Sequence, residues 1–481
     1  MTAAVVQAVS DRAAQALDAL GLPSDGDADA RIGRLAAAAA SADAAREVAW
    51  LAMTALLGRF PVARELAAVR RELLLAEDPA AGLLTATTPF DRIASGVARR
   101  MRIVTDRVLV DVGHTATSDH NTGIQRVVRR TLPEWRERPV ELVAWTADDR
   151  GYRALTAHET DRVLAWGGPR AEAVTPDDDL VVPWRTTVVL PEVAMLDRCA
   201  PLACLAAESG SRVGLIGYDL IPLVSADLID PVESDKTAHY LEVVKHADRV
   251  AGISASAASE FAGFVAALPA QGIAGPEVRT VALAEEPLAF DTAPAPTADG
   301  VVPILLSVGS HEPRKNQPAV LAAARILHEE GLAFRLVFVG GGSVEHAGPF
   351  DTEIAELARG GMAVESHRRL GDAELDALYR AARACVMVSL HEGYGLPVVE
   401  ALGRGVPVLT SDYGSLAEIA AGGGCLTVDP RDVVAIADGL RRLLVDDALV
   451  GRLRAEALAR PERTWRRYAN ELWDELVGGA A

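Results

Sequence analysis

The segment that decides the fold is Cys385-Val-Met-Val-Ser-Leu-His-Glu-Gly-Tyr-Gly-Leu-Pro-Val-Val-Glu400. Its first five residues, Cys385–Ser389, form a nearly continuous apolar run, as in a parallel strand that is buried on both faces. A short loop with two glycines follows, and Pro397 stands where a helix often begins with proline. The segment therefore predicts a strand, a loop and a helix, which together make one repeat of a doubly wound parallel sheet.

The same alternation of buried strands and helices continues on both sides of this segment, across residues 301–460. Such alternation indicates βαβ units and a parallel sheet, so we predict one doubly wound α/β domain over this range. Its other expected strands are Ile304–Val308, Phe334–Val339 and Val406–Thr410, and its expected helices are Pro318–Glu330, Asp351–Ala358, Asp372–Ala382 and one that starts at Pro397.

A second series of apolar runs lies upstream, within residues 101–284, and predicts a second doubly wound domain. Between the two domains, residues 285–300 contain three prolines and show no periodicity, which is typical of a linker. Because ligands of such sheets bind at the carboxyl ends of the strands, we expect both sheets to face one cleft. The expected upstream strands are Val108–Val112, Leu142–Trp145, Thr187–Leu190, Val213–Ile216 and Val250–Ile253, with a helix at Gly123–Leu132.

Residues 1–100 differ from the rest of the chain, because they are rich in Ala, Leu, Arg and Glu at helical spacing. We predict a helical N-terminal region that serves packing or homo-oligomerisation, with membrane contact or acceptor docking as the alternative. The expected helices run from a cap at Ser10-Asp11 to Leu20, from Leu35 to Ala45, from Glu47 to Leu57 and from Pro61 to about Ala76.

Charge and composition exclude several classes of protein. Forty-eight basic and 67 acidic residues give a net charge of −19, which argues against a nucleic-acid-binding partner. The four cysteines form no CxxC pair, and no run of 18 apolar residues could span a membrane. We therefore expect a cytoplasmic protein, and peripheral contact with the inner face of the cytoplasmic membrane is left open. Arg99, Arg100 and Arg102 are the candidate lipid contacts, with a solvated basic turn as the alternative.

Two segments of the downstream domain carry chemistry suited to a sugar and a diphosphate. Glycines 393 and 395 let the backbone approach a ligand, and Glu392 and Glu400 could each accept hydroxyl hydrogen bonds. Arg314 and Lys315 follow the first strand of this domain, and two adjacent cations there could neutralise a diphosphate. The alternatives are a helix entry with a dipole-favoured acid, and a solvated basic turn.

Loops of the upstream domain supply further candidates for the same cleft. Thr122-Gly123 opens a helix and so offers free backbone N–H groups to an anion. Asp219 ends another strand and could hold a substrate hydroxyl, with a strand-terminal cap as the alternative. The remaining candidates on the acceptor side of the cleft are Tyr218, Glu192 and His120, and for His120 and its neighbour His114 a structural or solvent-facing role is the alternative.

Together these segments resemble the retaining glycosyltransferases of family 4, which have the two-domain GT-B fold. The resemblance covers about residues 105–475, and its signature is a pair of glutamates with seven residues between them, matched by Glu392 and Glu400. Thr122–Arg126 and Tyr218–Pro222 resemble a bacterial, mannosyltransferase-like subgroup that builds surface polysaccharides. Many members carry histidine where Tyr218 stands, and this chain departs from them there.

The resemblance implies transfer of a hexose from a nucleotide-diphosphate sugar with retained anomeric configuration. In that scheme Glu392 holds the donor sugar, Glu400 holds the ribose, and Arg314 and Lys315 stabilise the leaving diphosphate. No metal is implied, and no cofactor beyond the nucleotide-sugar co-substrate. Residues 461–481 resemble the terminal helix that crosses back to the first domain. The implied catalytic residues are Glu392, Arg314 and Lys315, and the implied donor-binding residues are Gly123, Ile124, Gly309, Arg314, Lys315, Glu392, Gly393, Tyr394, Gly395, Leu396 and Glu400.

The resemblance specifies the donor and the acceptor less closely than it specifies the reaction. The subgroup favours GDP-mannose, while dTDP-rhamnose, GDP-fucose and UDP-hexoses stay open, and the implied acceptor is a glycan or a lipid-linked glycan. Other GT-B enzymes, such as a sugar-phosphate synthase or a nucleotide-sugar epimerase, and a non-catalytic GT-B scaffold are the alternatives. The acidic run at residues 177–179 is interpreted as a solvated loop rather than a metal site.

Overall fold

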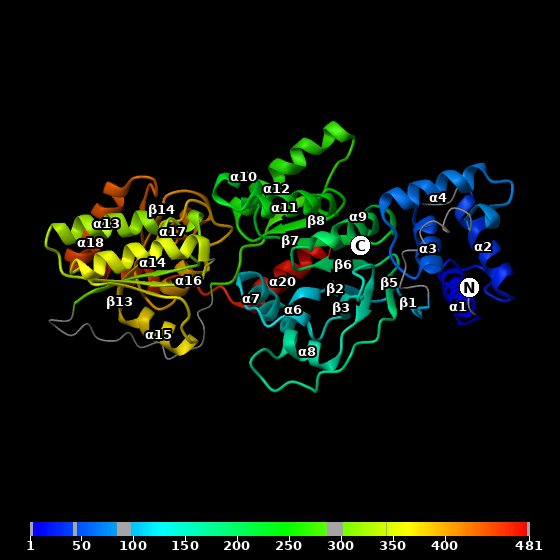
Figure 1. Cartoon of the computed structure of the whole chain (residues 1–481), viewed down its shortest axis with the longest axis horizontal. Helices are drawn as coiled ribbons and strands as arrows, with labels where there is room; N and C mark the ends of the chain where they lie inside the picture. The colour runs from blue at the N-terminus through cyan, green and yellow to red at the C-terminus, as the bar shows by residue number, and fades with distance from the viewer. Residues whose placement is uncertain (1–2, 42–45, 84–97, 286–301, 343, 479–481) are drawn as a thin grey trace.

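The computed structural model describes residues 3–41, 46–83, 98–285, 302–342 and 344–478. The chain forms two α/β domains and a group of N-terminal helices, which lie along one long axis (Figure 1). The predicted linker, residues 285–300, lies outside the described residues except for Glu285.

The first domain is built on a nine-stranded sheet of order β1-β5-β4-β3-β2-β6-β7-β8-β9, parallel except for β4. Its strands are β1 Met101–Val104, β2 Val108–Asp111, β3 Val140–Trp145, β4 Tyr152–Ala154, β5 Leu180–Pro183, β6 Thr187–Leu190, β7 Arg212–Gly217, β8 Arg249–Gly252 and β9 Glu277–Thr280. Its helices are α6 Gly113–Thr117, α7 Gly123–Thr131, α8 Ala157–Leu164, α9 Leu196–Glu208, α10 Ile221–Val224, α11 Pro231–Val244 and α12 Ala255–Ala267.

The second domain is built on a six-stranded parallel sheet of order β12-β11-β10-β13-β14-β15. This is the doubly wound order: from β10 the chain adds strands first toward one edge of the sheet and then, starting at β13, toward the other edge. Its strands are β10 Ile304–Val308, β11 Arg335–Val339, β12 Val364–His367, β13 Ala382–Met387, β14 Val408–Ser411 and β15 Cys425–Val428. Its helices are α13 Gln317–Glu329, α14 Val344–Arg359, α15 Asp372–Ala381, α16 Leu396–Leu402, α17 Gly414–Ala420, α18 Val433–Val445 and α19 Asp447–Leu458.

Helix α20, Trp465–Leu476, follows the second domain in sequence but packs on the first. In Figure 1 it is the red helix among the green and cyan elements of the first domain. Leu472 is fully buried, and the indole N–H of Trp135 donates to the carbonyl of Ala469 at 2.9 Å. Trp135 and Trp473 also meet edge to face, with ring centroids 5.3 Å apart. The helix therefore completes the hydrophobic core of a sheet that precedes it by the whole second domain.

The N-terminal helices share a hydrophobic core with the first sheet. Phe60 is the centre of this contact, with its ring centroid 5.5 Å from that of Trp50 and 5.3 Å from that of Tyr152. The buried guanidinium of Arg12 donates to the backbone carbonyls of Ala55 and Arg99, at 2.6 Å each. These contacts give the region a packing role within the chain, while homo-oligomerisation stays a prediction. The helices are α1 Ala3–Ala19, α2 Ala28–Ala40, α3 Arg46–Leu57 and α4 Ala63–Leu75.

Two of the helix starts expected in this region are wrong. Helix α1 begins at Ala3, and Ser10 lies inside it with its hydroxyl accepting from Arg31 at 2.9 Å. Helix α2 begins after Asp27, whose carboxylate caps the helix by accepting from the amide of Ala30 at 2.9 Å. An alanine-rich run allows helix to extend past an internal serine, so only the aspartate acts as a helix start.

In the basic turn at residues 99–102, Arg99 is buried, whereas Arg100 and Arg102 are exposed. Arg99 is buried and pairs with Asp148 at 2.9 Å and with Asp178 at 2.5 Å. Arg100 pairs with Asp179 at 2.7 Å, and Arg102 pairs with a glutamate of β3. In the acidic run at residues 177–179, Asp178 and Asp179 are half-buried in these ion pairs, while Asp177 is exposed as expected. The buried Arg99 is therefore no lipid contact, and lipid contact by Arg100 and Arg102 stays a prediction. No described helix is both long and apolar enough to cross a bilayer.

Candidate active site

The residues predicted to bind the diphosphate and the sugar lie together at the carboxyl ends of β10 and β13, where the strand order of the second sheet reverses. Arg314 and Lys315 lie in a 3₁₀ turn that follows β10, and Glu392 lies in the loop after the neighbouring β13. The amide of Leu390 donates to the carbonyl of Arg314 at 2.8 Å, which ties the two loops to each other. Loops at such a point diverge and leave a crevice at the carboxyl edge of the sheet.

Both cations bind the carboxylate of Glu392. Arg314 Nη1 lies 2.9 Å from Oε2, and Lys315 Nζ lies 2.5 Å from Oε1. Burial alone would raise the pKa of Glu392, but the attraction of Lys315 and Arg314 outweighs it and holds that pKa below its usual range. The carboxylate is therefore ionised and acts as an internal counter-ion for two cations.

Glycines permit the tight course of this loop. Gly395 has φ = 127°, a conformation that side chains rarely adopt, and a Cβ there would lie 2.7 Å from Leu416. A Cβ at Gly393 would lie 2.5 Å from the carbonyl oxygen of Tyr218. The loop therefore touches the backbone of the first domain at Gly393. Gly309, with φ = 157°, places the backbone after β10 beside the Lys315 stem, 3.6 Å from where a Cβ would stand.

Glu400 lies on α16 and is held from both domains. Arg126 of α7 donates to its Oε1, and the Tyr379 hydroxyl of α15 donates to its Oε2 at 3.1 Å. Glu400, the residue predicted to bind the ribose, is thus paired with an arginine of the first domain. A cavity of about 420 Å³ opens beside this pair. It is lined by Asn121, Arg126, Arg129, Arg130, Leu164, Ala165, Trp166, Asp372, Leu375, Asp376, Tyr379, Glu400 and Arg404.

The start of α7 faces the glycine loop, and the anion-binding role of Gly123 stays a prediction. Thr122 and Gln125 form a capping box that fixes the helix start. A Cβ at Gly123 would lie 3.6 Å from Leu396, and Ile124 and Leu396 pack against one shared hydrophobic cluster.

Other first-domain candidates are engaged inside their own domain. The Glu192 carboxylate is buried and accepts from the amides of His114 and Thr115, at 2.9 and 2.8 Å. The buried Tyr218 hydroxyl donates to the carbonyl of Pro191 at 2.8 Å. His120 is exposed and hydrogen-bonds Ser118. In this structure Glu192 and Tyr218 therefore hold loops, while His120 lies on the outer part of its loop.

Asp219 lies beside the glycine loop and within electrostatic reach of Arg314. A Cβ at Gly393 would be 2.8 Å from its Oδ2, while Oδ1 accepts from the amide of Ile221 at 3.2 Å. Burial raises the pKa of Asp219 to about 6, and the nearby Arg314 partly offsets that rise.

Tyr394 of the glycine loop is also buried, and its hydroxyl donates to the carbonyl of Leu283 at 3.3 Å.

Several contacts across the cleft were not predicted from the sequence. The Ser254 hydroxyl donates to the carbonyl of Gly393 at 2.7 Å, and the amides of Ala255 and Ser256 donate to Glu418 at 2.9 and 2.6 Å. A cavity of about 230 Å³ lies beside Glu392 at this junction. It is lined by Ser225, Ser256, Ser389, Leu390, His391, Glu392, Tyr413, Gly414, Ser415, Leu416 and Arg431.

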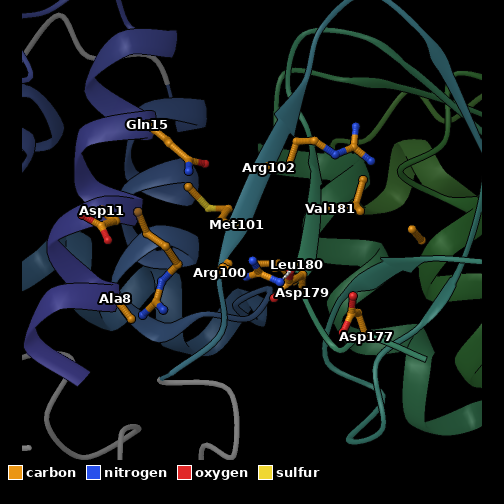
Figure 2. A pocket seen from close by; sticks show the side chains of 12 residues that line it. Ala8, Asp11, Gln15, Arg100, Met101, Arg102, Asp177, Asp179, Leu180 and Val181 are labelled. Atoms are coloured by element: carbon orange, nitrogen blue, oxygen red, sulfur yellow. Dashed lines mark ion pairs between the residues drawn. The ribbon is translucent and has the colours of Figure 1, made fainter. Parts of the chain in front are cut away.

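A further cavity, of about 530 Å³, lies away from the cleft, between α1 and the strands β1 and β5 (Figure 2). The charges around it are satisfied within the protein: Arg100 pairs with Asp179, Arg102 pairs with Glu141, and Arg12 donates to backbone carbonyls. Figure 2 shows Arg100 and Asp179 at its centre. We assign it no part in the candidate site.

Comparison with known proteins places these features in a family context. Residues 293–460 match the family Glycosyl transferases group 1. O-antigen chain mannosyltransferase B of Escherichia coli is 37% identical over 147 residues, which cover 30% of this chain and 37% of that protein. Serotype-specific mannosyltransferase WbdA of Escherichia coli is 27% identical over 364 residues, which cover 70% of this chain and 43% of that protein. The matches thus span less than half the length of these two relatives.

A solved structure shows the same arrangement of domains. Sucrose-phosphate synthase from Thermosynechococcus elongatus aligns with a TM-score of 0.54 over 78% of this chain and 100% of that chain, at 17% identity. At that identity the likeness concerns the fold alone, and it confirms the predicted pair of Rossmann-like domains. The chain therefore has the GT-B fold, and residues 293–460 are similar to the glycosyl transferases of group 1.

Proposed function

We propose that the chain is a retaining glycosyltransferase that moves mannose from GDP-mannose to a glycan or lipid-linked glycan during polysaccharide synthesis. The observation that carries the proposal is the triad of Arg314, Lys315 and Glu392 at the reversal point of the second sheet. It supplies two cations for a leaving diphosphate and a carboxylate for sugar hydroxyls. The names of the two relatives support mannose as the sugar.

In the proposed reaction the bond between the anomeric carbon and the β-phosphate oxygen breaks, and a bond to the acceptor oxygen forms on the same face. The proton of the acceptor hydroxyl passes to the leaving β-phosphate oxygen. Negative charge gathers on the diphosphate, where Arg314 and Lys315 would stabilise it. Glu392, released from the cations by the diphosphate, would accept hydrogen bonds from the sugar. Glu400 would exchange Arg126 for the ribose hydroxyls. Asp219 would face the acceptor, and no protein nucleophile or metal ion is assigned.

The first experiment is calorimetric titration of the purified chain with GDP, UDP and dTDP. We expect micromolar binding of GDP and a loss of at least about tenfold in Arg314→Ala, because the guanidinium meets the diphosphate directly. The conservative variant Arg314→Lys keeps the charge but not the planar fork, and should fall between the two. Binding of UDP or dTDP instead would change the donor, and no binding of any nucleotide would overturn the proposal.

The second experiment is incubation with GDP-mannose and a mannose-terminated oligosaccharide. Mass spectrometry would detect the added hexose, and proton NMR of the new linkage would give its anomeric configuration. An α-linked product from the α-linked donor is the expected result. A β-linked product would contradict retention, and epimerised nucleotide sugar without transfer would favour an epimerase.

A further inference from the structure

His391 precedes Glu392 directly and is the residue through which this loop meets two first-domain side chains. Its Nδ1 lies 2.8 Å from the Ser225 hydroxyl, and its Nε2 lies 2.8 Å from Glu260 Oε1. Ser225 follows α10 and Glu260 lies on α12, so both ring nitrogens contact the first domain. The histidine side chain is largely buried at 15% exposure.

Glu260 is itself fixed by the backbone. Its Oε2 accepts from the amide of Leu220 at 2.6 Å, so its two oxygens join the end of β7 to the second domain. A carboxylate held by an amide offers His391 a rigid partner. The peptide that carries Glu392 is thus fixed on one side by His391 and on the other by the bond from Ser254 to Gly393.

We propose that His391 is a positioning residue, whose bridge to Ser225 and Glu260 couples closure of the two domains to the placement of Glu392. The inference rests on the proposed function for the role of Glu392, but the bridge itself is a statement about domain closure. When the domains separate, both bonds break, and the loop loses its support next to the carboxylate. A misplacement of about 1 Å at such a group can cost about 10²-fold in rate.

The protonation of His391 gives the bridge a pH dependence. The hydrogen bond to Glu260 raises the pKa of His391 above its usual value, although burial opposes the rise. The carboxylates facing the ring are Glu260 on α12, Asp219 after β7 and Glu392 in its own loop, while Arg431 lines the adjoining cavity. The ion pair is complete below the ordinary histidine pKa and is lost as pH rises through the raised value, so closure should weaken on the alkaline side.

The test measures turnover and shape together, in wild type, His391→Ala, His391→Gln and Glu260→Gln. Small-angle X-ray scattering on the ligand-free protein reports closure without reference to activity. We expect His391→Ala to increase the radius of gyration and to lower kcat by about 10–10²-fold, with the donor KM changed by less than about threefold. His391→Gln, whose amide can still donate to Glu260, should retain more kcat and lose the alkaline fall in rate.

His239→Gln is the matched control, because His239 lies exposed on α11, outside the cleft, and should change neither quantity. Thermal unfolding of every variant separates loss of fold from loss of closure. Wild-type scattering and kcat in His391→Ala would overturn the inference, and so would a more open shape with unchanged kcat. A more open His391→Ala in a protein that transfers no sugar would leave the bridge standing and overturn the proposed function instead.

Discussion

Glu392 pairs with the two cations that a diphosphate would bind. Its side chain therefore has two separable effects: it would bind the sugar, and it competes with the diphosphate for Arg314 and Lys315. Glu392→Gln keeps the volume of the side chain but removes the charge. We expect transfer to fall by at least about 10²-fold, because the sugar loses a charged hydrogen-bond acceptor. Affinity for the nucleoside diphosphate should not fall, because Arg314 and Lys315 are freed from their internal partner. Calorimetry and a transfer assay on the same preparation would check both.

Glu312→Gln is the matched control for this variant. Glu312 also pairs with Arg314, at 2.9 Å, but it is more exposed and touches no other cation among the described contacts. It should leave transfer within about threefold of wild type, as an exposed ion pair contributes little. A parallel loss of diphosphate binding and transfer in Glu392→Gln would mean that the carboxylate only organises the cations.

Helix α20 follows the second domain in sequence but packs against the first domain. Leu472→Ala removes a fully buried side chain from the core of the first sheet and should lower the free energy of unfolding by about 2–5 kcal/mol. Urea denaturation followed by tryptophan fluorescence would measure it. Leu458→Ala on α19, where the leucine is 62% exposed, should change stability by less than about 0.5 kcal/mol. Equal losses in the two variants would contradict the packing described for α20.

The buried strands of both sheets could be predicted because their apolar runs are continuous. The strands β9, Glu277–Thr280, and β12, Val364–His367, were not predicted, since each lies at a sheet edge and carries charged or polar residues. The short strands β1 and β4 and the edge strand β15 were also missed. The strand β5 is the exception to the rule, because it was missed although its four residues are buried and apolar. An edge strand buries only part of its surface, so its sequence shows little hydrophobic pattern.

Part of the candidate site could likewise be predicted from the sequence, and part could not. Arg314, Lys315, Glu392 and Glu400 were predicted because each lies near the end of a predicted strand or the start of a helix. The pairing of Arg126 with Glu400 was not, since 274 residues separate them, and the pairing of Glu260 with His391 spans 131 residues. Such partners depend on how two domains meet, which no local spacing encodes.

The N-terminal helices and the first sheet share one hydrophobic core, so we expect them to unfold as one unit. Phe60→Ala should destabilise this unit by about 3–5 kcal/mol, since the ring is fully buried against Trp50 and Tyr152. Near-ultraviolet circular dichroism should show one transition for helices and sheet. Leu75→Ala, at a leucine that is 81% exposed, should leave the transition in place. An early, separate loss of the helices in Phe60→Ala would show that they fold independently.

The return of α20 to the first domain also bears on how the chain is made. A ribosome synthesises residues 465–476 only after it has synthesised the entire second domain. Until then β7 and β8 lack the helix that covers them, and Leu476, which lies 3.1 Å from the Cβ position of Gly214, has not been translated. The first domain therefore holds an unfinished apolar face while the second domain is synthesised, and its native core can close only after α20 has left the ribosome.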